Sequence, residues 1–150
     1  RLSSESKLEI RGMLREVTEI ESIGDSCYNL ARTINRKRSG GNDFTEKQYE
    51  HIHEMMKLTD AALAHMIAIV EDEHHSVDVN KSFNIEIEMN NYRAQLKNQN
   101  VVDVNNKEYD YQMGVHYMDI IGECEKLGDY VVNVVEARTN VKEKKTGDNR

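Results

Sequence analysis

Residues 19–31 read EIESIGDSCYNLA, and residues 123–135 repeat the same pattern as ECEKLGDYVVNVV. The recurring residues are Glu19, Glu21, Gly24, Asp25 and Asn29 in the first copy, and Glu123, Glu125, Gly128, Asp129 and Asn133 in the second. The offset is constant, because 125 − 21 and 129 − 25 both give 104. A repeat at a fixed offset indicates two copies of one structural element. We therefore expect the function to lie between the two copies.

The composition predicts an all-α protein. The chain has 150 residues, no proline and only eight glycines. Apolar residues recur every three to four positions, which is the period of an amphipathic helix rather than a strand. A chain of this length most simply forms one domain. We predict an antiparallel bundle of four long helices joined by short loops.

The helix boundaries follow from capping residues and breaks in the periodic pattern. In the first helix, apolar or small residues form one stripe: Ile10, Leu14, Val17, Ile20, Gly24, Cys27, Ala31 and Ile34. Thr45 with Gln48 predicts a capping box for the second helix, and Asn105 with Glu108 predicts a cap for the fourth. The expected helices cover about 4–37, 46–74, 78–99 and 106–139, and a frayed or disordered tail is expected over 140–150.

The charge distribution excludes some partners. The net charge is −7, with acids in every segment, whereas nucleic-acid binding requires a basic stripe. The basic clusters at 32–38 and 142–145 lie near expected helix C-termini, which favour cations. Cys27 and Cys124 are expected to be reduced cytosolic thiols. No apolar run is long enough to span a membrane, and because the chain opens at Arg1 we expect a piece of a longer protein.

Each copy of the repeated stretch carries two avoidable local costs. Its E-x-x-x-D spacing places two like charges one turn apart, which costs a helix a few tenths of a kcal/mol. No Lys or Arg on the same helix neutralises either pair. Gly24 and Gly128 lie in mid-helix, where glycine is about 1 kcal/mol less favourable than alanine. Coinciding costs of this kind are expected at functional sites.

These carboxylates predict a metal site if the first and last helices are neighbours. The candidate ligands are Glu21, Asp25, Glu125 and Asp129, with Asn29 and Asn133 one turn further along. Hard oxygen ligands on bundle helices suit Fe, Mn, Mg or Ca, and Zn less well. The alternative is that each pair lies on a solvated surface, or meets Arg and Lys from another helix.

At these residues the chain resembles the PhoU family, whose helical repeats carry a signature of the form E-R-I-G-D-x-x-x-N-I. The copies here read ESIGD with Asn29 and EKLGD with Asn133, so Ser22 and Lys126 replace the usual arginine. The resemblance implies that residues 1–38 are the terminal helix of one repeat, whose first two helices are missing. It also implies that residues 45–139 form a complete second repeat.

The stretch NNYRAQL, residues 90–96, is most similar to PhoU-like domains at the cytoplasmic ends of sodium/phosphate cotransporters. The resemblance therefore implies a non-enzymatic regulatory or adaptor domain of an inner-membrane phosphate transporter. Its partners would be the membrane part of that transporter or a signalling protein, and a homodimer is open. In some family members the E-x-x-x-D residues bind iron or zinc clusters, which carries over to Glu21, Asp25, Glu125 and Asp129.

Two other functions stay open. A di-iron carboxylate enzyme needs two Glu-x-x-His pairs on different helices, but Glu50–His53 and Glu71–His74 both fall on the second expected helix. A structural dimerisation module is the other alternative, if apolar helix surface is left uncovered. No nucleophilic triad, phosphate-binding loop or dinucleotide fingerprint is present in the sequence, so we expect no enzyme activity.

Overall fold

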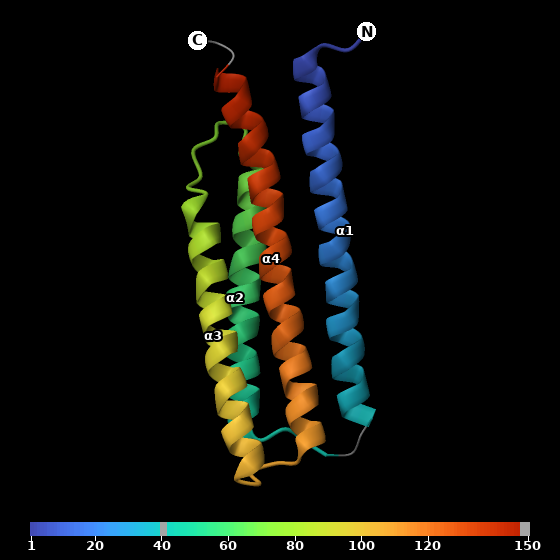
Figure 1. Cartoon of the computed structure of the whole chain (residues 1–150), viewed down its shortest axis with the longest axis vertical. Coiled ribbons are helices and arrows are strands. Elements are labelled where there is room, and N and C mark those ends of the chain that lie inside the picture. The colour runs from blue at the N-terminus through green and yellow to red at the C-terminus, as the bar shows by residue number, and fades with distance from the viewer. Residues whose placement is uncertain (40–41, 148–150) are drawn as a thin grey trace.

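The computed structural model describes residues 1–39 and 42–147, with side chains up to 37 and from 42 to 139. Four long helices make up the fold: α1 (Ser4–Ser39), α2 (Glu46–Glu71), α3 (Asn80–Asn105) and α4 (Tyr111–Gly147). Figure 1 shows them side by side with their long axes roughly aligned. The predicted fold class, an all-α bundle of four long helices, is confirmed.

The capping box of α2 is confirmed. Thr45 Oγ1 accepts a hydrogen bond from the Gln48 backbone N–H at 3.1 Å, and Gln48 Oε1 accepts one from the Thr45 N–H at 3.0 Å. The helix ends at Glu71, earlier than the predicted His74. The reason is Asp72, whose carboxylate accepts from the backbone N–H groups of His74 and Val77 and so fixes a turn.

The predicted cap of the fourth helix is wrong. α3 continues to Asn105, beyond the predicted end at residue 99. The chain then turns at Lys107, whose φ of 59° is left-handed. α4 is capped instead by Asp110, whose Oδ1 accepts from the Met113 N–H at 2.8 Å.

The backbone of α4 continues to Gly147, whereas the sequence predicted a disordered tail from residue 140. The last three residues of that predicted tail, 148–150, lie outside the described residues. No helix of the described part is long and apolar enough to cross a membrane.

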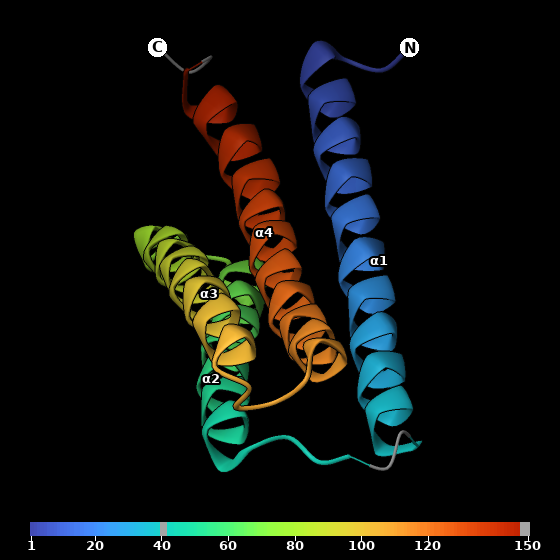
Figure 2. The ribbon, with the colours of Figure 1, turned by 60° about the horizontal axis from the view of Figure 1, so that its bottom comes forward.

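α4 is the helix that holds the others together. It packs against α1, α2 and α3, while α2 and α3 also pack against each other. In the described chain α1 contacts α4 alone among the helices, and Figures 1 and 2 show it lying to one side of the other three. The core consists mainly of fully buried side chains of α4 with those of α2 and α3, among them Met55, Met89, Ile121, Leu127, Val131 and Val134.

The apolar stripe that was predicted to face the bundle in the first helix is mostly exposed. We call this surface the outer stripe. It consists of seven residues of the predicted stripe and two exposed neighbours, Met13 and Tyr28; the seven are Ile10, Leu14, Val17, Ile20, Gly24, Cys27 and Ala31. The eighth predicted residue, Ile34, is partly buried against the core. α1 contacts α4 through a different face, which includes the buried residues Ile23 and Ser26 and the partly buried Leu30. That face is more polar, and its polar groups find matching partners on α4. Ser26 Oγ, for example, donates to Glu123 Oε2 at 2.8 Å.

The two repeated glycines differ in their surroundings. A Cβ added at Gly128 would lie 2.9 Å from Met89 Sδ, so the thioether of α3 fills the notch that this glycine leaves. A Cβ added at Gly24 would meet nothing within 4 Å. The helices therefore approach closely at Gly128, whereas the notch at Gly24 is open.

We expect Gly24→Ala and Gly128→Ala to have different effects on stability. Gly24→Ala should raise the free energy of unfolding by about 1 kcal/mol, because alanine favours the helix and the space is free. Gly128→Ala should give no such gain, because Met89 must move to admit the methyl group. Chemical denaturation of both variants measures the difference, and equal gains would contradict the packing of Met89 against Gly128.

Candidate functional site

The two copies of the repeat lie opposite each other in the α1–α4 pair. Ser26 of the first copy bonds Glu123 of the second, and Asn133 Nδ2 of the second donates to Glu19 Oε2 of the first at 3.1 Å. The helices run antiparallel, as Figure 1 shows. The condition stated for a shared site, that the first and last helices are neighbours, is therefore met.

In the α4 copy, Glu125 is neutralised by a residue of α3. Arg93 Nε lies 2.8 Å from Glu125 Oε2, in an ion pair that lacks hydrogen-bond geometry. The Glu125 side chain keeps only 20 % of its surface exposed. The sequence left open that the acids pair with Arg or Lys of another helix, and Glu125 does so.

Asp129, one turn further along α4, lies near a second acid of α3. The pKa of Asp129 is raised to about 6; partial burial is the largest cause, followed by a hydrogen bond with Glu86 and by the negative charges of Glu125 and Glu86. Arg93 lowers the same pKa. Glu86 also accepts a hydrogen bond from Asn90 Nδ2 at 2.7 Å. We call Glu86, Asn90, Arg93, Glu125 and Asp129 the polar seam of the α3–α4 pair.

In the α1 copy, Glu21 and Asp25 are exposed. Neither forms an ion pair or a hydrogen bond within the described part of the chain. Within the described part of the chain, Asp25 has no neighbour equivalent to Glu86, and Glu21 has none equivalent to Arg93. The two equivalent pairs thus differ because α3 covers only one of them.

The two predicted carboxylate pairs have different surroundings in the described part of the chain. Arg93 already supplies the positive charge at Glu125, and the α1 copy offers two solvated carboxylates only. Among the described residues, no three His, Cys, Asp or Glu side chains are placed to hold one ion. Metal binding by Glu21, Asp25, Glu125 and Asp129 stays a prediction, and elemental analysis of protein purified without a metal-affinity step tests it.

The other candidates of the sequence are dispersed. Glu50 and His53 are exposed on α2, and His74 lies beyond its end, so the described residues do not assemble a ferritin-like site. Cys27 is an exposed free thiol and Cys124 a buried one.

The sequence reading missed the contribution of α3 to this site. Glu86, Asn90 and Arg93 are spaced at i, i+4 and i+7, which places them along one side of a helix. This polar line runs beside the buried residues Ile85 and Met89. The spacing was visible, but which helix it would face depends on tertiary packing.

Neither models of protein families, nor curated proteins, nor solved structures match this chain. The resemblance to the PhoU family therefore rests on the repeated motif and its spacing.

We expect Asp129→Asn to change the pH dependence of stability. The native state holds the Asp129 proton more tightly than the unfolded chain, whose ordinary pKa is 3.8. This tighter proton binding stabilises the native state. The stabilisation is present below about pH 4 and is lost as the pH rises through about 6. The wild type should therefore lose about 1 kcal/mol more than the variant between these limits, after allowance for solvent screening.

Urea denaturation at several pH values measures this difference. Asp25→Asn removes the same charge from the equivalent position on α1 and is the matched control. A change of equal size in both variants would show that the effect is one of net charge and not of the contact with Glu86.

Proposed function

We propose that this chain is a PhoU-like regulatory domain that works without catalysis on the cytoplasmic side of a sodium-dependent phosphate transporter. It acts by protein contact, and the outer stripe of α1 is its contact surface. The observation that carries the proposal is the relation between the outer stripe and the equivalent face of α4. The next steps derive the kind of partner that this relation implies.

The repeat offset of 104 residues maps the exposed outer stripe onto the buried face of α4. The equivalent pairs are Val17 and Ile121, Ile20 and Cys124, Gly24 and Gly128, Cys27 and Val131, and Ala31 and Val135. Val17 and Ile20 are 54 % and 45 % exposed, whereas Ile121 and Cys124 are fully buried. The same sequence pattern is thus covered in one copy and open in the other.

The cover on α4 is the hairpin of α2 and α3. Thr59 of α2 lies beside the buried Cys124 thiol, and Met89 of α3 fills the notch at Gly128. A surface that repeats this pattern suits a partner of the same kind. We infer that the partner is a pair of antiparallel helices, with a long apolar side chain for the notch at Gly24.

Charge adds a second feature to this partner. Glu125 is paired with Arg93 of the hairpin, while the equivalent Glu21 has no partner in the described chain. A carboxylate at the edge of an apolar contact is costly to bury unless it is paired. The partner helices therefore carry an arginine or lysine opposite Glu21.

The regulatory role is tested by measuring sodium-dependent phosphate uptake in cells that make the protein. Val17→Lys with Ile20→Lys places two charges in the outer stripe and should abolish most of the response of uptake to external phosphate, because buried unpaired charges prevent docking. Ile67→Lys with Ile87→Lys is the matched control, because these isoleucines are similarly exposed on α2 and α3. An identical response in both double variants would overturn the proposal.

A homodimer is the second candidate, and the same exposed stripe favours it. Light scattering of the purified chain distinguishes the two. A dimer that becomes a monomer in the Val17→Lys, Ile20→Lys variant would assign the outer stripe to a second copy. If the wild type and the variant are both monomers, the outer stripe would be assigned to a different protein.

A further inference from the structure

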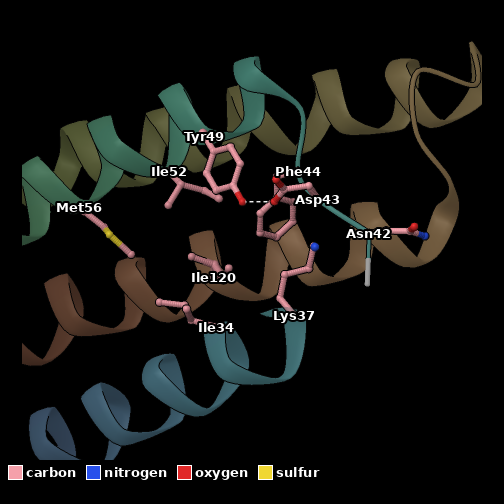
Figure 3. A pocket seen from close by; sticks show the side chains of 9 residues that line it. All are labelled: Ile34, Lys37, Asn42, Asp43, Phe44, Tyr49, Ile52, Met56 and Ile120. Atoms are coloured by element: carbon pink, nitrogen blue, oxygen red, sulfur yellow. Dashed lines mark hydrogen bonds between the residues drawn. The ribbon is translucent and has the colours of Figure 1, made fainter. Parts of the chain in front are cut away.

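A cleft of about 570 Å³ lies between the end of α1, the segment before α2, and α4. Figure 3 shows the side chains around it. Its apolar walls come from three helices, with Ile34 on α1, Ile52 and Met56 on α2, and Ile120 on α4. Ligand sites are typically clefts of this size with mainly apolar walls and a small number of polar groups.

Phe44 gives the cleft a fixed aromatic wall. Its side chain is 7 % exposed and makes edge-to-face contacts with Tyr49 at 5.6 Å and Tyr117 at 6.4 Å between ring centroids. Tyr49 also donates a hydrogen bond to Asp43 in the cleft wall. These contacts hold the polar end of the cleft in place.

Lys37 is the unexplained group in this cleft. It is only 7 % exposed, yet it forms no hydrogen bond or ion pair in the described chain. Its Nζ lies 4.8 Å from the centroid of the Phe44 ring, and Figure 3 shows it directed toward that ring from the end of α1. A cation–π contact with one ring replaces only part of the hydration that an ammonium group has in water.

The acid in the cleft wall does not neutralise this lysine. Asp43 accepts the hydrogen bond of the Tyr49 hydroxyl and forms no ion pair with Lys37. A purely structural role for Lys37 would be to stabilise the C-terminal end of α1 through the helix dipole. That role requires neither the burial of the lysine nor an apolar cleft beside it.

We propose that this cleft binds a small amphipathic monocarboxylate. The carboxylate accepts hydrogen bonds from Lys37 Nζ, and the apolar part lies along Ile34, Ile52, Met56 and Ile120. One ammonium group matches a single negative charge. A doubly charged phosphate ester would keep one charge unpaired beside the carboxylate of Asp43, whereas the single charge of a monocarboxylate is matched by Lys37, so we assign the site to monocarboxylates.

The test is a calorimetric or NMR titration of the whole chain with octanoate at millimolar concentration. We expect saturable binding to the wild type, and at least about tenfold weaker binding of octanol, which has the same chain length without the charge. Lys37→Met keeps the apolar stem and should weaken octanoate binding by about tenfold or more, equivalent to 1.4 kcal/mol. Lys57→Met is the matched control, because Lys57 is an exposed lysine of α2 paired with Glu54.

A second variant guards against a folding defect in Lys37→Met. Ile34→Trp fills the apolar part of the cleft and leaves Lys37 in place, so it should also abolish octanoate binding while thermal unfolding stays cooperative. Absence of saturable octanoate binding to the wild type would overturn the proposal. So would equal affinity in the wild type, Lys37→Met and Ile34→Trp proteins.

Discussion

The burial of α4 on two sides is the constraint on which the rest of the structure depends. One face of this helix packs against α2 and α3, and another holds α1. The first contact is apolar and close, because Gly128 lets Met89 approach the helix backbone. The second is largely polar, with Glu16 paired to Arg138 and Ser26 bonded to Glu123. α1 is therefore placed by specific polar contacts, while most of its apolar surface is free.

Much of the fold could be predicted from the sequence because its signals are local. The helical period of the apolar residues predicted the all-α fold class, and the capping box of Thr45 and Gln48 predicted the start of α2. The errors arose where tertiary packing decides. The outer stripe has the pattern of a bundle-facing surface, but no pattern within one helix specifies which neighbour is present. The pairing of Glu125 with Arg93 likewise joins two helices, so the spacing within each one gave only the acid and not its partner.

The two copies of the repeat have the same sequence pattern but differ in burial. The offset of 104 residues pairs each residue of one stretch with a residue of the other. The burial of these residues shows that the face of α4 is covered, whereas the outer stripe of α1 is open. The two copies differ in whether the local costs of the repeated pattern are offset. At Gly128 and Glu125 the unfavourable glycine and the crowded acid are offset by Met89 and Arg93. At Gly24 and Glu21 the same costs have no compensation in the described chain, and a bound helical partner would supply it.

The reactivity of Cys27 shows whether a partner covers the outer stripe in the cell. Cys27 lies in the outer stripe as an exposed thiol, and Cys124 is a buried thiol of the equivalent face in α4. The rate of alkylation of each would be compared between the purified chain and the protein in the cells that make it. Cys27 should react fast in the purified chain and slowly in the cell, whereas Cys124 should react slowly in both. Equally fast reaction of Cys27 in both settings would show that the outer stripe has no partner.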